Sequence, residues 1–341
     1  MESATRLPAE WEPQSAVQFT FPHPDTDWAD MLDDVIPCFL DCIRAVSRFE
    51  QVLIVCYDLK WVDRQLANLD RTNLILAELP SNDTWARDHG GITILVDNQP
   101  VILDFVFNGW GLKFAADKDN LITSGLKRLG VFGSTPVLPG GIALEGGGIE
   151  SDGQGTLMTT THCLLSPNRN PHMDQAATEA FLKQRFGLKK VLWLRNGYLA
   201  GDDTDSHIDT LARFCDPETI AYVQCTDESD EHFEALRLME QELKAFRTPG
   251  GQPYRLVPLP MPSPVYAEEG YRLPATYANF LIINGAVLVP VYGVPEDETA
   301  LERLRPLFPG REIIAIDCSA LIRQHGSLHC ISMQYPRSVA T

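Results

Sequence analysis

Four residues with reactive side chains recur along this 341-residue chain at nearly even spacing: Asp88, Glu145, His207 and Cys330. The first two intervals are 57 and 62 residues, and the third, 123, is about two such steps. The skipped step falls in the stretch around residues 277–279. Repeats that each deliver one residue to a common centre are typical of a closed repeat architecture. An acid, a base and a thiol that meet there predict a nucleophilic active site.

The pair His207 and Asp209 is the first candidate for acid/base chemistry. In a strand, residues two apart face the same side, so we expect these two side chains to project together. A histidine beside a carboxylate is a general acid/base candidate, because small pKa shifts carry its charge across neutral pH. A surface histidine that happens to lie near an acid is the common alternative, and the pair alone does not decide between them.

Cys330 is the candidate nucleophile, and it follows His329 in a predicted last strand near residues 328–333. Adjacent strand residues face opposite sides, so the base for Cys330 should be His207 rather than His329. A thiol with a pKa of about 8.5 is only slightly ionised at neutral pH and needs a nearby cation. The other seven cysteines lie in apolar segments, and we expect them to be inert core residues: Cys38, Cys42, Cys56, Cys163, Cys215, Cys225 and Cys318.

The tetrapeptide Trp85–Asp88 offers an indole face and a carboxylate. A planar cation such as guanidinium stacks on an indole and donates edge-on to a carboxylate. Asp88 and Asp209 together would hold one guanidinium in a fork. Taken by itself, the tetrapeptide fits an Arg87–Asp88 surface pair beside a core tryptophan equally well.

Three glycines follow Glu145, as in a phosphate-binding loop. The Lys-Ser/Thr that should follow such a loop is missing, and Glu145 would repel phosphate. We therefore expect the glycines to let the backbone pass a crowded centre while Glu145 orients the histidine. Metal binding is a weaker alternative, since His162, Cys163 and His325 lack complementary ligand spacing. No metal or organic cofactor is expected.

The elements that would position these residues alternate between amphipathic helices and apolar strands. Helices are predicted at about 28–47, 61–69, 120–129, 173–186, 228–246 and 297–307. Four units of the order strand, strand, helix, strand begin near residues 91, 146, 207 and 278. A fifth unit is completed only when the last strand pairs with the strand at 16–21, which leads into the first helix. The sequence therefore predicts one continuous α/β domain, 1–341, whose two ends share one unit.

The net charge of −18 opposes binding to nucleic acid or anionic membranes and favours a small cationic partner. A merely acidic surface explains the charge equally well. No apolar run approaches the ~20 residues of a membrane span, and the first residues lack the pattern of a secretory signal. Scattered cysteines without a disulfide framework favour the cytoplasm.

The motifs, taken in order, resemble the agmatine deiminases. These belong to the Porphyromonas-type peptidyl-arginine deiminase family, within the guanidino-group-modifying superfamily. The resemblance spans the chain from Pro8 to Cys330 and includes several long motifs: 8–13 (PAEWEP), 82–88 (NDTWARD), 145–147 (EGG), 164–171 (LLSPNRNP), 201–214 (GDDTDSHIDTLARF) and 329–330 (HC). Two segments depart from the family pattern. HGSL at 325–328 stands where a glycine run and Asn-Ile are usual, and Ser3, Ala4 and Thr5 stand where some relatives carry an acid that meets the substrate amine.

The resemblance implies a pentein fold, a five-bladed α/β propeller of ββαβ repeats around a central site. It implies Cys330 as nucleophile and His207 as general acid/base. Glu145 matches the acid that supports the histidine. The residues that match substrate contacts are the guanidinium-binding acids Asp88 and Asp209, Trp85 over the substrate, and Asp203 near it.

The implied reaction is hydrolysis of agmatine to N-carbamoylputrescine and ammonia through a covalent S-alkylthiouronium on Cys330. Deimination of free or peptidyl arginine is an alternative within the class. A non-catalytic binding protein on the same fold is an alternative of another class, against which stands the presence of every reactive residue. A homodimer is expected from base rates alone.

Overall fold

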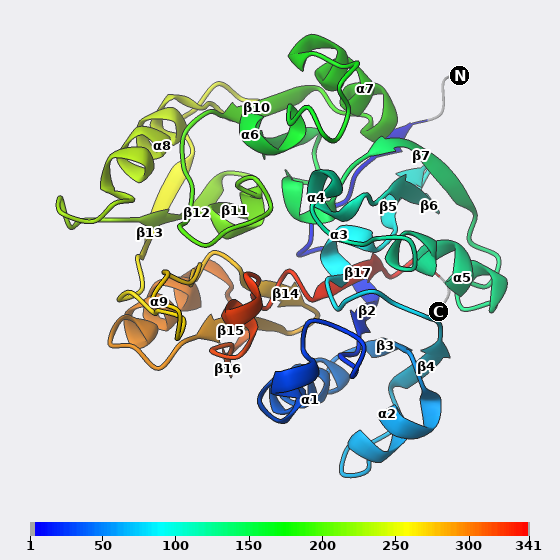
Figure 1. Ribbon diagram of the computed structural model, residues 1–341. Helices are drawn as coiled ribbons and strands as arrows, with labels where there is room; N and C mark the ends of the chain where they lie inside the picture. Colours follow the sequence, from blue (N-terminus) through cyan, green and yellow to red (C-terminus); the bar gives the residue numbers. More distant parts are fainter. Residues whose placement is uncertain (1–3, 340–341) are drawn as a thin grey trace.

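The computed structural model describes residues 4–339, which form five small sheets arranged around a common centre (Figure 1). The strands are β1 (Thr5–Arg6), β2 (Gln14–Thr20), β3 (Gln51–Cys56), β4 (Leu74–Glu78), β5 (Ile92–Val96), β6 (Gln99–Val106), β7 (Val137–Ala143), β8 (Ile149–Ser151), β9 (Thr156–Thr160), β10 (Lys190–Leu194), β11 (Ala212–Asp216), β12 (Thr219–Gln224), β13 (Arg255–Pro260), β14 (Leu281–Ile283), β15 (Ala286–Val291), β16 (Glu312–Asp317) and β17 (Ser332–Pro336). The sheet orders are β1-β5-β6-β7, β10-β9-β8, β11-β12-β13, β14-β15-β16 and β17-β2-β3-β4. The α/β repeat architecture predicted from the sequence is confirmed.

Each unit contains an antiparallel pair followed by a parallel strand, with a helix in the connection. The helices are α1 (Leu32–Ser47), α2 (Leu59–Gln65), α3 (Ala86–His89), α4 (Gly109–Leu112), α5 (Ile122–Arg128), α6 (Thr161–Leu164), α7 (Gln175–Phe186), α8 (Phe233–Ala245) and α9 (Glu296–Leu304). The turn Asp97–Asn98 has two left-handed residues, with φ of 50° and 61°. That backbone matches the twist of a two-residue hairpin.

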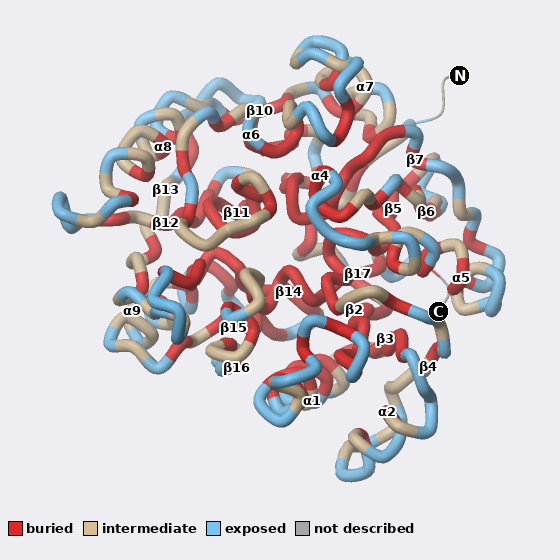
Figure 2. Tube along the Cα trace, viewed as in Figure 1, coloured by how far each residue is buried: buried red, intermediate tan, exposed pale blue. Residues whose placement is uncertain are grey.

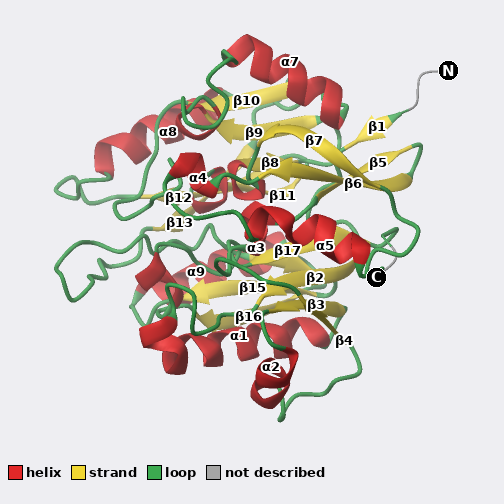
Figure 3. Cartoon of the chain, turned by 45° about the vertical axis from the view of Figure 1, so that its right-hand side comes forward, coloured by secondary structure: helices red, strands yellow, loops and turns green. Residues whose placement is uncertain are grey.

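The larger helices lie on the periphery of the ring, and the strands lie inside them (Figures 1 and 3). Helix α1 shows why: its apolar stripe, which includes Val35, Phe39 and Ile43, is buried, while Asp33 and Asp34 face out. Buried backbone surrounds the centre and exposed backbone lies at the rim (Figure 2). Among the described residues, no helix has both the length and the apolar character that crossing a membrane requires.

The two ends of the chain share one sheet, as predicted. β17 pairs antiparallel with β2, and β2 pairs parallel with β3. β2 is therefore an inner strand with a neighbour on each side, and residues 16–20 are all buried. The N-terminal segment closes the ring and is part of its core.

We expect deletion of residues 1–20 to abolish folding, because it removes this inner strand and leaves two unpaired edges in the closing sheet. Circular dichroism and size-exclusion chromatography of the truncated chain test this expectation. A monodisperse product with a cooperative thermal transition would contradict it.

Two local predictions were wrong. His207 and Asp209 do not lie in a strand, because residues 208–210 form a single 3-10 turn, η4 (Ile208–Thr210). Cys330 lies in a turn two residues before β17 and not within the strand. In both places the chain turns at the ring centre before its strand begins, and short turns of this kind have no hydrophobic period that a sequence could reveal.

Candidate active site

Five loops meet at the ring centre, and each carries one polar residue just before a pair of antiparallel strands. Asp88 lies on α3 before β5, Glu145 before β8, His207 before β11 and Cys330 before β17. The fifth position, before β14, is Asn279. It lies within the stretch 277–279, where the spacing predicted a repeat unit without a reactive residue. The ring therefore brings together all four residues that the spacing selected, and adds an amide.

Gly147 shows how crowded this centre is. A Cβ atom placed on Gly147 would lie 2.6 Å from His207 Nδ1, 2.8 Å from Asp88 Oδ1 and 3.2 Å from Asp209 Oδ2. No side chain fits there without displacing a polar group. This confirms the expectation that the glycines let the backbone pass the reactive residues closely. It also shows that His207, Asp88 and Asp209 converge, although not for the strand reason given above.

Asp88 is buried and held by two donors. Its Oδ2 accepts from Trp110 Nε1 at 3.0 Å, and its Oδ1 accepts from the Gly147 amide at 3.0 Å. Burial raises the pKa of Asp88 to about 6, although His207 and the Trp110 hydrogen bond act in the opposite direction. The carboxyl group of Asp88 is therefore fixed in place, but it is mostly ionised only above a pH of about 6.

Asp209 is fully buried, and its two oxygens differ. Oδ2 accepts from His329 Nδ1 at 2.7 Å, while Oδ1 has no hydrogen-bond partner among residues 4–339. Burial alone would favour the neutral acid, but the His329 hydrogen bond and charge outweigh it and lower the pKa of Asp209. A buried, ionised carboxylate with a free oxygen is an acceptor for a cationic donor.

Cys330 is buried, and its thiol contacts Asn279. Asn279 Oδ1 accepts from the backbone amides of His329 (2.8 Å) and Cys330 (3.3 Å), and it lies 3.4 Å from Cys330 Sγ. Because that oxygen is an acceptor, the thiol donates to it and is neutral. Burial, followed by Asp209 and Asp88, raises the pKa of Cys330 well above its usual value. A cation must enter before this thiol can ionise readily.

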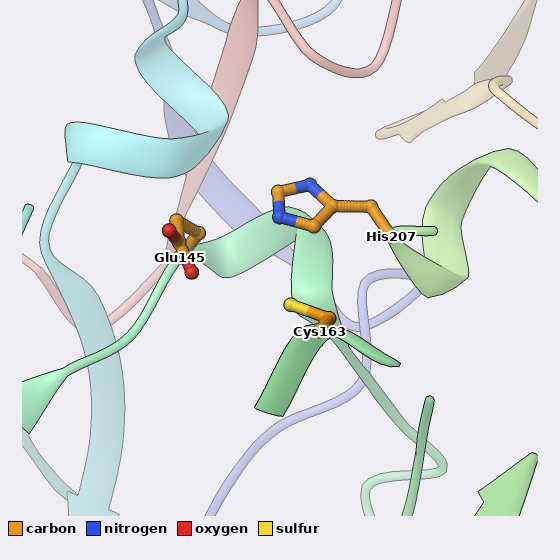
Figure 4. Close-up of side chains that lie close together, drawn as sticks. All are labelled: Glu145, Cys163 and His207. Atoms are coloured by element: carbon orange, nitrogen blue, oxygen red, sulfur yellow. The ribbon is translucent and has the colours of Figure 1, made fainter. Parts of the chain in front are cut away.

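His207 lies between the two sides of the site. Its Nδ1 is 3.6 Å from Asp88 Oδ1, and its Nε2 has no hydrogen-bond partner within the described residues. The ring nitrogen on the other side faces Glu145 and Cys163 (Figure 4). Burial favours the neutral ring, but Asp88 and Cys163 outweigh it and raise the pKa of His207 well above its usual value. The ring can therefore carry a proton that a leaving group needs.

Glu145 is tied mainly to a residue that the sequence did not reveal as a partner. Both carboxylate oxygens accept from Arg169 Nε at 2.9 Å. One carboxylate oxygen, Cys163 Sγ and one His207 ring nitrogen lie within 4.8 Å of one another, the arrangement of a potential metal site. Cys163 is buried, as expected, but its thiol meets the histidine. The role of Glu145 in orienting His207 stays a prediction.

A narrow pocket opens onto Cys330 and Asp88. Trp85 and Trp110 line it beside the thiol, and three further carboxylates, none of them at the ring centre, complete the wall. Its lining residues are Asp27, Asp83, Trp85, Asp88, Trp110, Phe114, Asp203, Thr204, Gln324, His325, Gly326 and Cys330. None of these lining residues is Lys or Arg. The pocket suits a slender ligand with a cation at each end.

The three outer acids differ in how far they are already engaged. Asp83 is held by Trp28 Nε1 and Trp85 Nε1, each at 2.9 Å, so it fixes the Trp85 indole that lines the pocket and the Trp28 indole that packs against it. Asp27 is exposed, and Asp203 is half-buried. Burial raises the pKa of Asp203 to about 6, against the opposing effect of His325.

His325 belongs to the first of the two segments that depart from the family pattern. It adopts a left-handed backbone (φ 68°), its Nδ1 lies 2.8 Å from the Gly201 carbonyl oxygen, and its ring stacks on Tyr271 at 5.8 Å. A glycine would reach that backbone at lower cost. In this chain the histidine side chain instead makes contacts with Gly201 and Tyr271 that hold the loop before Cys330 in place.

Comparison with known proteins was made across the whole chain. The model of the family "Porphyromonas-type peptidyl-arginine deiminase" matches residues 6–336. The chain is 31% identical to an agmatine deiminase of Pseudomonas aeruginosa, over 97% of this chain and 95% of that protein.

Two solved structures are similar throughout. One is a Cys-to-Ser variant of the Campylobacter jejuni agmatine deiminase with substrate bound, 38% identical, with a TM-score of 0.92 over 98% of this chain and 96% of that one. The other is a Porphyromonas gingivalis protein whose name assigns it provisionally to the arginine deiminases. It is 54% identical, with a TM-score of 0.94 over 99% of this chain and all of that one.

Proposed function

This chain belongs to the Porphyromonas-type peptidyl-arginine deiminase family, and from that premise we propose that it hydrolyses agmatine to N-carbamoylputrescine and ammonia. The observation that carries this proposal is a pocket lined by the Cys330 thiol, by four carboxylates that include Asp88 and Asp203, and by two indoles. Agmatine has a guanidinium, four methylene groups and an ammonium, so it offers two cations to these carboxylates and an apolar stem to the indoles.

In the first half of the reaction, Asp88 and the free oxygen of Asp209 hold the guanidinium. When the guanidinium binds, the Cys330 thiol releases its proton to solvent, and the thiolate attacks the guanidinium carbon and forms a C–S bond. His207 donates its proton to one terminal nitrogen, the C–N bond breaks, and ammonia leaves. An S-alkylthiouronium on Cys330 and a neutral His207 remain.

In the second half, His207 takes a proton from water, and the hydroxide formed attacks the same carbon. The adduct collapses, the C–S bond breaks, and Cys330 leaves as a thiolate. The hydroxyl proton of the adduct passes to solvent and ends on ammonia as ammonium. The product is the neutral ureido compound, His207 is protonated again, and the Cys330 thiolate regains a proton from solvent when the product leaves.

Substrate binding itself supports ionisation of the nucleophile. Without a ligand, Asp88 and Asp209 disfavour a thiolate at Cys330. A guanidinium bound between them compensates their charge and adds a positive group beside the sulfur, which lowers the thiol pKa. A neutral resting thiol also limits reaction with other electrophiles.

A ureido assay of the purified protein with agmatine, free arginine and a blocked arginine peptide side by side tests the substrate. We expect turnover of agmatine at a kcat/KM at least ~100-fold above the other two, since their carboxylate or peptide groups would face Asp27 and Asp203 across a pocket without a cation. Faster turnover of arginine would keep the reaction but overturn the substrate.

Free or peptidyl arginine is the second candidate, and the name of the 54% identical P. gingivalis protein favours it. Free arginine needs a cation to meet its α-carboxylate, and none of the lining residues is Lys or Arg. The third candidate, a non-catalytic binding protein, predicts no turnover of any of the three compounds.

The outer carboxylates give a sharper prediction. Asp203→Asn should raise the KM for agmatine about tenfold and change kcat less than threefold, because Asp203 meets the distant ammonium and not the reacting carbon. Steady-state kinetics of the variant, with Asp27→Asn beside it and the surface variant Asp97→Asn as control, measure this. A fall in kcat with an unchanged KM would contradict the assignment.

The pH dependence follows from the raised pKa of Asp88. Guanidinium binding needs the carboxylate, and the pKa of Asp88 is about 6 in the free protein. We therefore expect kcat/KM for agmatine to be highest above pH 7 and to fall as the pH drops through about 6. Trp110→Phe removes a donor to Asp88 and should move this limb to higher pH. A flat profile down to pH 5 would contradict the role of Asp88.

We further propose that the partner of the chain is a small cation, and that it works in the cytoplasm. The net charge of −18 and the acidic pocket support the first statement. A homodimer is our expectation for its assembly, which sedimentation analysis would test.

A further inference from the structure

His329 and Glu10 lie behind Asp209 in a continuous chain of hydrogen bonds. Asp209 Oδ2 is 2.7 Å from His329 Nδ1, and His329 Nε2 is 2.6 Å from Glu10 Oε2. All three side chains are buried, with exposed fractions of 0%, 1% and 6%. Each ring nitrogen faces a carboxylate oxygen, which can only accept, so both nitrogens carry a proton and His329 is an imidazolium.

Glu10 is held so that it cannot turn away from His329. Its Oε2 also accepts from Arg213 Nη2 at 3.0 Å, and its Oε1 accepts from the Ile282 amide at 2.7 Å. Arg213 is itself fixed by Glu150 Oε2, at 2.9 Å from its Nε. The chain of hydrogen bonds is therefore anchored in β11 and β14, on two neighbouring sheets.

His329 does not face the nucleophile, although it precedes Cys330 in the sequence. Cys330 lines the substrate pocket, whereas His329 and Glu10 line a second cavity that they share with Arg87 and Glu150. The polar contacts of Cys330 Sγ are Asn279 Oδ1 and, at 4.0 Å, Asp209 Oδ2. His329 therefore does not contact the thiol directly, and its effect on the reaction must pass through Asp209.

We propose that His329 and Glu10 are positioning residues that hold Asp209 ionised, with its Oδ1 aimed at the guanidinium. The proposal rests on the proposed function, since it assigns Asp209 a cationic substrate. The imidazolium occupies Oδ2, which leaves Oδ1 as the buried oxygen without a partner. It also compensates the charge of Asp209 before the substrate arrives, so ionisation does not depend on substrate binding.

Several charged groups face the hydrogen-bonded residues Asp209, His329 and Glu10. His329, His207 and Arg213 face Asp209, while Arg213, His329 and Arg87 face Glu10. The arginines stay charged throughout the working range. A variant that removes the imidazolium charge therefore exposes the titration of Asp209, and a second acid limb should appear beside that of Asp88.

The test is steady-state kinetics of His329→Gln and Glu10→Gln from pH 5 to 9, with thermal melting to confirm folding. For His329→Gln we expect the KM for agmatine to rise ~10- to 100-fold, the loss typical of a charge-assisted hydrogen bond. kcat should fall less, and a second acid limb, that of Asp209, should appear in the kcat/KM profile beside that of Asp88. Glu10→Gln should show the same changes to a smaller degree.

His89→Gln is the matched control. His89 is also buried and adjacent to a site residue, but its Nε2 meets only Thr20 Oγ1, at 3.3 Å, and no carboxylate. Its loss should lower the melting temperature without changing KM or the pH profile.

A purely structural role for His329 predicts a lowered melting temperature with the wild-type KM and pH profile, and that result would overturn the proposal. If His329→Gln does not fold, Glu10→Gln decides by the same criteria. A wild-type protein that turns over no guanidino compound would instead refute the proposed function. Turnover of arginine in place of agmatine would leave this test intact with arginine as substrate.

Discussion

Replacing Cys330 by alanine should lower agmatine turnover by at least about four orders of magnitude, because removing a nucleophile leaves only binding and acid/base groups. Agmatine binding should persist, since the acids that hold the guanidinium are untouched. Single-turnover kinetics and isothermal titration calorimetry measure the two quantities separately.

Cys215→Ala is the control for this variant. Cys215 is another buried cysteine, on β11, whose thiol lies outside the pocket. It should cost stability without costing turnover. Substantial residual activity in the Cys330 variant would refute the covalent route, and mass spectrometry of the wild-type protein quenched during turnover should show the thiouronium adduct.

Replacing Asp209 by asparagine should lower kcat/KM for agmatine by about three orders of magnitude. The change removes one of two charges that face the guanidinium in a buried site, where such a pair is worth a few kcal/mol. Asparagine also has only one acceptor oxygen, whereas His329 and the guanidinium are both donors. Its NH2 group must therefore face one of these two donors, and no hydrogen bond forms there. The loss should appear in both KM and kcat, because the substrate would be bound more weakly and less well oriented.

Asp216→Asn, at the far end of β11, is the matched control, since Asp216 Oδ1 accepts only from the Glu218 amide. Its kinetics should equal those of the wild type. An Asp209 variant with an unchanged KM would show that the guanidinium is held elsewhere, and a fork of Asp88 and Asp209 would then be wrong.

The ring of five sheets could be predicted from the sequence because the same pattern of elements recurs along the chain. Apolar strands, amphipathic helices and one reactive residue per unit recur at similar spacing, and hairpin turns such as Asp97–Asn98 have a residue pattern of their own. The same periodicity located Cys330, His207 and Glu145, and it marked the stretch that contains Asn279. It did not assign Asn279 a role, because an asparagine in an apolar segment has no distinctive pattern.

The contacts that the sequence missed join residues that are far apart along the chain. Arg169 lies on the loop after α6 and contacts Glu145, while Trp110 lies on α4 and donates to Asp88. His329 contacts Glu10, which is 319 residues away in the chain. Such pairings depend on how the loops fold over the ring centre, and nothing in the local sequence of either partner specifies that path.

The shared sheet of β2 and β17 has a consequence for how the protein is made. β2 is complete after residue 20, but its antiparallel neighbour is not synthesised until residue 336. At ~5–20 residues per second, the ribosome needs roughly 15–60 s to synthesise the residues between β2 and β17. During that time the edge of β2 that later pairs with β17 has no partner strand. The nucleophile lies two residues before β17, so the chain acquires its chemistry only in the last moments of its synthesis. An incomplete chain is therefore an inactive one, and chaperones that shield exposed strand edges should bind the nascent protein near its beginning.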